Sequence, residues 1–195
     1  MLSFRRIKKV AFLSISLTLV LTSETLCSYV GFFDDFKQGD WRFESLGGLG
    51  LSGPAESDRK GDYYFAGSLE YEWSIYGSRT NVGIRLYPAF IYHQEENDKG
   101  DTDTVFGEAL GVDLRRYQYI NNRGCYWEIG VSTMWNSRLF RNNAARWNFL
   151  SEIGIGYKFD SDWHVALKFQ HISNAETRSP NAGVNALALC LGFTF

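Results

Sequence analysis

Proline and cysteine are both scarce in this chain, with 3 of each among 195 residues. So few cysteines exclude a disulfide-rich scaffold, and their spacing offers neither a CxxC pair nor a His/Cys group of the kind that binds zinc. Positive charge is not in excess, because 20 Lys+Arg face 22 Asp+Glu, so we expect no nucleic-acid partner. Beyond residue 27 no apolar run approaches the roughly 18 residues that a membrane helix needs.

Aromatic residues, at 16%, and 19 glycines are what the chain has in quantity. Aromatic residues favour strands, and glycine often marks turns and bulges. The composition therefore predicts an all-β chain. Two classes remain open at this point, a soluble β protein and a β-barrel of the outer membrane.

The first 27 residues have the pattern of a secretory signal peptide. A positively charged start is followed by an apolar run of 12 residues at 10–21, which is too short to span a membrane as a helix. The sequence Thr25-Leu26-Cys27 offers a cleavage site. We therefore expect a signal peptide at 1–27, a lead segment at 28–39 and a single β-barrel domain at 40–195.

Apolar residues alternate with polar ones in eight segments, which is the period of a strand. In the first segment we expect a slip of the alternation near its glycines. The apolar positions are Trp41, Phe43, Leu49 and Leu51; Phe65, Leu69, Tyr71 and Trp73; Val82, Ile84, Leu86, Phe90 and Tyr92; Phe106, Leu110, Val112 and Leu114; Trp127, Ile129, Val131 and Trp135; Phe149, Ile153, Ile155, Tyr157 and Phe159; Trp163, Val165, Leu167 and Phe169; Leu187, Leu189, Leu191, Phe193 and Phe195.

Charged residues recur at the opposite positions of these strands and predict an eight-stranded antiparallel transmembrane β-barrel with paired charges inside. They are Glu70, Glu72, Arg85, Asp113, Arg115, Glu152 and Lys158. Short turns at 76–79, 119–124 and 160–162 alternate with longer loops at 52–61, 94–103, 136–145 and 174–183, as in bacterial outer-membrane barrels. His93 is placed on the Arg85 face, and neither His93 nor His164 is given a role.

The strand ends favour the membrane over a soluble barrel. Many strands carry aromatic residues at one or both ends, as interfacial girdles do. The last strand ends on Phe195, which resembles the signal read by the outer-membrane assembly machinery, an expected partner. In the soluble alternative the apolar face would point inward around a core. Cys125 and Cys190 are expected to stay unpaired, Cys190 on an inward position.

One motif stands out in the last forty residues. Phe169-Gln170-His171-Ile172-Ser173-Asn174-Ala175 is followed by Pro180-Asn181-Ala182-Gly183-Val184-Asn185. This combination resembles the lipid A 3-O-deacylase (PagL) family of outer-membrane acyl hydrolases, in which a His-x-Ser-Asn-Ala segment is followed by a Pro-Asn-x-Gly turn.

The resemblance implies serine esterase chemistry, and no feature of the sequence calls for a metal or other cofactor. Ser173 would be the nucleophile and His171 its general base, since a serine hydroxyl needs an adjacent base to take its proton. The family has a glutamate where this chain has Asn185. Glu176, close by, is a candidate substitute carboxylate. Asn174 and Asn181 are candidate donors to the oxyanion.

The alternation places these residues independently of the family. His171 and Ser173 continue the odd-numbered apolar face of 163–169, and Asn185 shares the parity of 187–195. Residues two apart on a strand point the same way. If the strand persists to Ser173, the three side chains gather on the lipid-facing rim beside the 174–183 loop, at the outer leaflet, where lipid A lies.

The sequence therefore predicts an integral outer-membrane esterase that removes an ester-linked 3-O acyl chain from lipid A of lipopolysaccharide. Asn185 in place of glutamate motivates an alternative, a catalytically weak or inert barrel with a structural or surface-interaction role. A third class, a soluble exported binder, requires the apolar face to point inward.

Overall fold

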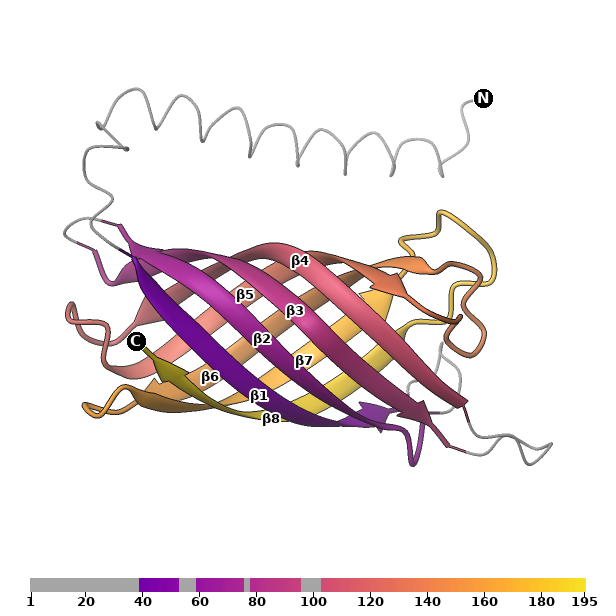
Figure 1. Cartoon of the computed structure of the whole chain (residues 1–195), viewed down its shortest axis with the longest axis horizontal. Coiled ribbons are helices and arrows are strands. Elements are labelled where there is room, and N and C mark those ends of the chain that lie inside the picture. Colours follow the sequence, from indigo (N-terminus) through magenta and orange to yellow (C-terminus); the bar gives the residue numbers. More distant parts are fainter. Residues whose placement is uncertain (1–38, 53–58, 76–77, 96–102) are drawn as a thin grey trace, which may run out of the picture. The chain divides into compact units, whose positions relative to one another are not determined.

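The computed structural model describes residues 39–52, 59–75, 78–95 and 103–195. The predicted signal peptide at 1–27 and, apart from Gly39, the predicted lead segment lie outside these residues, as do parts of the predicted turn at 76–79 and of the loops at 52–61 and 94–103. Eight antiparallel strands form a closed barrel (Figure 1), as predicted. The strands are β1 (Asp40–Leu51), β2 (Tyr63–Ser74), β3 (Thr80–Gln94), β4 (Asp103–Tyr117), β5 (Gly124–Asn136), β6 (Trp147–Lys158), β7 (Trp163–Ser173) and β8 (Val184–Thr194).

Closure joins the first strand to the last. β1 pairs with β8 over ten residue pairs, from Arg42–Thr194 to Leu51–Asn185. The chain's final residue is tied in as well, because the Trp41 and Phe195 backbones exchange hydrogen bonds of 2.9 and 2.8 Å. Every strand therefore has two neighbours, and the sheet presents no open edge. Among the described residues no helix is long and apolar enough to cross a membrane.

The apolar face of the alternation points outward. Leu189 is 68% exposed and Ile155 is 65% exposed, whereas Arg115 and Lys168 at inward positions are 0% exposed. This arrangement overturns the soluble alternative, which needs an apolar core and a polar outer face. An outward band of apolar side chains around a polar interior is the pattern of a membrane barrel.

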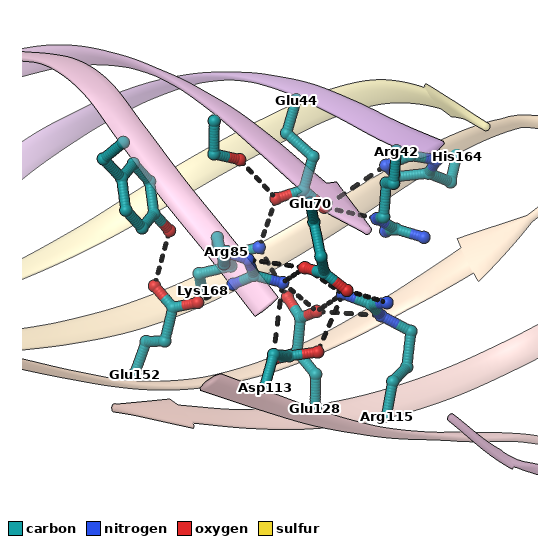
Figure 2. A network of polar contacts seen from close by, with 12 residues as sticks. Arg42, Glu44, Glu70, Arg85, Asp113, Arg115, Glu128, Glu152, His164 and Lys168 are labelled. Carbon is teal, nitrogen blue, oxygen red and sulfur yellow. Dashed lines mark hydrogen bonds and ion pairs between the residues drawn. The ribbon is translucent and has the colours of Figure 1, made fainter. Parts of the chain in front are cut away.

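Part of the barrel interior is a network of ion pairs (Figure 2). Arg115 contacts Glu70 at 2.9 Å, Glu72 at 2.5 Å and Glu128 at 2.7 Å. Arg85 contacts Glu70, Asp113, Glu128 and Glu152, and Lys168 bridges Glu44 and Glu128 at 2.6 and 2.7 Å. The predicted pairing of inward charges is confirmed, except that Lys158 pairs with Asp162 in the β6–β7 turn at 3.7 Å.

Small inward residues make room for these charges. A Cβ on Gly83 would lie 2.8 Å from the Cγ of Glu70, closer than side-chain atoms pack. A glycine here allows the Glu70 carboxylate to reach Arg85 and Arg115. The strands are thus shaped around the charge network, since eight strands leave an interior that side chains fill.

Two details of the predicted strands are wrong. β1 shows no slip, because its pairing to β2 and β8 runs without interruption through Gly47 and Gly48. In β3 the register shifts between Tyr87 and Phe90, so Phe90 and Tyr92 point into the barrel and His93 no longer shares the face of Arg85. The shift occurs at Pro88, which has no N–H for the ladder and is accommodated at a bulge.

The two cysteines within the barrel are unpaired. Cys125, at the start of β5, is exposed, and Cys190 is buried at an inward position of β8. Both observations match the expectation from the sequence.

Candidate active site

β7 persists to Ser173, as the placement of the site requires. The strand ends at Ser173 and β8 begins at Val184, so the intervening loop is 174–183. His171 pairs across the sheet with Asn185 on β8 and with Ser151 on β6, and Ser173 pairs with Phe149. The side chains of His171, Ser173 and Asn185 occupy outward positions and are half-buried, so the predicted parity holds.

His171 and Asn185 are joined by a hydrogen bond. The Nδ1 atom of His171 lies 2.7 Å from Oδ1 of Asn185. An amide oxygen can only accept, so with this pairing a neutral His171 carries its proton on Nδ1 and keeps the lone pair on Nε2. This is the tautomer that a general base needs when its partner is a serine hydroxyl. Asn185 therefore occupies the position from which a third residue orients the histidine.

Ser173 lies two residues further along the same strand. Two residues advance a strand by about 6.6 Å, a separation that the two side chains can bridge from one face. Within the described part of the chain no hydrogen bond joins Ser173 to His171. Such bonds are often loose before substrate binds, and the parity of the strand keeps both groups on one surface.

Glu176 does not hold the histidine in this structure, because Asn185 occupies Nδ1 of His171. Glu176 is exposed, and its backbone is left-handed with φ of 61°. Thr177 N–H and Oγ1 close a tight turn around it by donating to the Asn174 carbonyl at 3.0 and 2.8 Å. Glu176 is the predicted substitute carboxylate, but among the described residues no hydrogen bond joins it to His171.

A clamp between two loops supports this end of the barrel, where the β5–β6 and β7–β8 loops lie side by side (Figure 1). Asn143 and Asn181 form an isolated bridge, flanked by Ala144 N–H to the Pro180 carbonyl at 2.9 Å and Ala182 N–H to the Asn142 carbonyl at 2.8 Å. These contacts join a loop that precedes β6 to the loop that carries the candidate site.

Asn174 is buried within this clamp, directly after Ser173. Its Nδ2 donates to Oδ1 of Asn143 at 3.1 Å and to the Pro180 carbonyl at 3.4 Å. Its backbone N–H donates to Oδ1 of Asn181 at 2.9 Å. Every N–H of Asn174 is therefore engaged within the protein, so none is left over for the predicted oxyanion in this structure, and these bonds hold the loop in place.

Asn181 keeps a donor available. Its Oδ1 accepts from Asn174, and its amide Nδ2 has no acceptor among the residues that the structure describes. The side chain is half-buried at the rim. Of the two predicted oxyanion donors, Asn181 is thus the one whose geometry still permits the role.

Comparison with protein-family models identifies the family of this chain. The model of the lipid A 3-O-deacylase (PagL) family matches residues 60–194, more than half of the chain. The chain belongs to this family. The match includes His171, Ser173 and the β7–β8 loop, so the predicted resemblance is confirmed. At the family level the chain is therefore related to hydrolases that act on lipid A.

Several solved β-barrels are similar to this chain, and the PagL structure supports the fold. A crystal structure of the outer-membrane enzyme PagL is 18% identical, with a TM-score of 0.57, and covers 78% of this chain and 98% of that one. The N-terminal barrel domain of OprF from Pseudomonas aeruginosa is 14% identical, with a TM-score of 0.47, over 81% of this chain and 100% of that one. Ail from Yersinia pestis is 11% identical, with a TM-score of 0.47, over 82% and 100%.

A curated alanine–tRNA ligase from Streptomyces avermitilis also matches locally. It is 26% identical over 72 residues, which cover 36% of this chain and 8% of the ligase. The chain thus spans less than a tenth of the ligase's length, and the match carries no argument about the PagL-family barrel.

The interior brings together one group with metal-ligand chemistry that no sequence spacing revealed. Ligand atoms of Glu44, His164 and Cys190 lie within 4.8 Å of one another. Glu44 is already held by Arg42 at 2.8 Å and Lys168 at 2.6 Å. A cation placed there would meet two fixed positive charges, so we assign these residues to the ion-pair network.

Proposed function

We propose that this PagL-family barrel is an outer-membrane serine esterase that removes the ester-linked 3-O acyl chain from lipid A. The observation that carries the proposal is the 2.7 Å bond between His171 Nδ1 and Asn185 Oδ1, on the outward face one step from Ser173. It leaves Nε2 of His171 as the proton acceptor. A general base, a serine and a lipid-exposed surface then meet at one rim of the barrel.

The reaction follows from these roles. Nε2 of His171 takes the proton of Ser173 as Oγ attacks the ester carbonyl, and the carbonyl oxygen becomes an anion near Nδ2 of Asn181. The bond to the sugar oxygen then breaks, and His171 returns the proton to that oxygen. Water, deprotonated by His171, then attacks the acyl-serine; the bond to Oγ of Ser173 breaks, His171 returns the proton to Oγ, and the fatty acid is released.

The orientation of the barrel fits a substrate in the outer leaflet. With the signal peptide at 1–27 removed and both termini of the barrel domain in the periplasm, the β7–β8 loop lies on the outer side of the membrane. Lipid A can then reach Ser173 sideways from the leaflet. The substrate therefore needs no path through the barrel, which the ion pairs of the interior fill.

A second candidate function rests on Asn185. An amide orients imidazole but cannot neutralise the imidazolium that forms when the serine is deprotonated, and losing a triad carboxylate costs about 10⁴ in rate in a serine protease. The second candidate is therefore a barrel of this family with weak or no hydrolysis, retained for a structural or surface-interaction role.

Purified barrel in detergent micelles with lipid A tests the esterase. We expect release of one fatty acid by the wild-type protein and none by Ser173→Ala or His171→Ala. All three proteins should show the same heat-modifiable migration on gels, which reports folding. Folded wild-type protein that releases no fatty acid would favour the second candidate.

A further inference from the structure

Ser151 is a polar residue on the lipid-facing surface of β6. It is exposed at an outward position of the strand. Its outward neighbours along β6 are Phe149, 45% exposed, and Ile153, 56% exposed, and Val131 pairs with it from β5. The Ser151 hydroxyl is therefore flanked by apolar side chains along β6 and from β5, on a surface that would face acyl chains.

The register places Ser151 beside the candidate site. It pairs directly with His171, on the side of the histidine opposite Asn185. Directly paired residues of antiparallel strands have Cβ atoms about 4.5–5.5 Å apart. Across the sheet, Ser151, His171 and Asn185 thus form one row of polar side chains, and Ser173 lies in the next row.

The hydroxyl of Ser151 lacks a partner among the described residues. A hydroxyl moved out of water without a hydrogen bond is unfavourable. Of its two cross-strand neighbours, Val131 offers nothing to bond, while His171 uses Nδ1 for Asn185 and, in the proposed reaction, Nε2 for Ser173. A polar atom arriving with the substrate would satisfy it.

Depth in the membrane points to the part of the substrate involved. The row of Ser151 and His171 lies two residue pairs nearer the middle of the barrel than the row of Phe149 and Ser173. An ester held at Ser173 sends its acyl chain down toward this row. The oxygens at the carboxyl end of that chain are the polar atoms that pass closest to Ser151.

We propose that Ser151 is a further substrate-binding residue, whose hydroxyl donates a hydrogen bond to an oxygen at the carboxyl end of the scissile acyl chain. The inference rests on the proposed function, because it needs an ester at Ser173. Its contribution is to binding rather than to proton transfer, so it acts on KM more than on kcat.

Two measurements on the folded barrel in micelles test this role. The first is steady-state deacylation of lipid A by wild type, Ser151→Ala and Ser151→Thr. The second is covalent labelling with a small fluorophosphonate, mapped by peptide mass spectrometry. Ser45→Ala is the matched control, since Ser45 is an exposed outward serine of β1 that pairs with Gly67 and Leu191, away from His171.

We expect Ser151→Ala to lower kcat/KM by about 3- to 10-fold through KM, the size of one neutral hydrogen bond. Ser151→Thr should restore most of it, and labelling of Ser173 should be unchanged. Kinetics of Ser151→Ala equal to those of Ser45→Ala would overturn the role of Ser151 alone. Labelling at Ser151 instead of Ser173 would also overturn it. No labelling and no deacylation by wild type would overturn the proposed function itself.

Discussion

Asn143 and Asn174, 31 residues apart in the chain, bond through their side-chain amides at 3.1 Å across two loops of the barrel rim. The bond fixes the residue that follows Ser173. Asn143 is itself held by its Nδ2 donating to Asn148 at 2.8 Å, while its Oδ1 also accepts from Ala145 N–H at 2.9 Å. The β5–β6 loop is therefore part of the support of the candidate site.

Replacing Asn143 with Ala should loosen this support. Nδ2 of Asn174 would lose its best acceptor in a buried setting, which is unfavourable by about 1–3 kcal/mol. We expect faster amide hydrogen exchange in both loops and a lower kcat. Asn142→Gly is the control, because Asn142 contributes its backbone carbonyl and has φ of 56°. Unchanged exchange in the 174–183 loop of Asn143→Ala would contradict the clamp.

Asn185→Glu tests the residue in which this chain departs from its family. A carboxylate at the same position would accept from His171 Nδ1 and also stabilise the imidazolium by charge. We expect lipid A deacylation to rise at least about tenfold, within the range of about 10⁴ that a triad carboxylate supplies. Asn185→Ala should fall below wild type. If Asn185→Glu is slower than wild type, Asn185 does not act as a less effective replacement for the family glutamate.

Glu176→Gly separates conformation from catalysis in the β7–β8 loop. A non-glycine residue in the left-handed region is disfavoured by about 1–2 kcal/mol, and Glu176 has φ of 61°. We expect a higher unfolding temperature and unchanged deacylation. Loss of activity comparable to that of His171→Ala would show that the carboxylate of Glu176 takes part in the reaction.

Arg115→Met tests the interior network. The substitution leaves Glu70, Glu72 and Glu128 without one of their cations in a buried setting, and breaking a buried ion pair costs about 3–5 kcal/mol. We expect unfolding at a clearly lower urea concentration. Arg116→Met is the matched control, because the neighbouring Arg116 is exposed and bonds Thr80 at 3.2 Å. Equal effects would contradict the network's role.

Much of the fold was readable from the sequence because strand alternation reports which way each side chain points. The odd-numbered face of 163–173 placed His171 and Ser173 on the outer surface, and β7 does persist to Ser173. The bulge at Pro88 escaped prediction, since its effect on Phe90 and Tyr92 depends on the register with β4. Glu128 and Lys168 obey the same parity rule, and the alternation could have identified them as inward charges.

The candidate site was only partly readable. The motif indicates His171, Ser173 and the position of Asn185, but the role of Asn174 depends on Asn143 in another loop. Likewise, Ser151 has no signal of its own in the sequence. Its position beside the candidate site follows only from the β6–β7 register, which pairs it with His171. Pairing between strands and contacts between loops are set by the closed barrel, not by any local pattern.

Mass spectrometry of lipid A from outer membranes expressing this chain tests the central claim most directly. With wild-type protein the account predicts a lipid A species lighter by one ester-linked 3-O acyl chain. Membranes with equal amounts of folded Ser173→Ala should retain the intact species. Intact lipid A in the presence of folded wild-type protein, or the same shortened species with Ser173→Ala, would contradict the account.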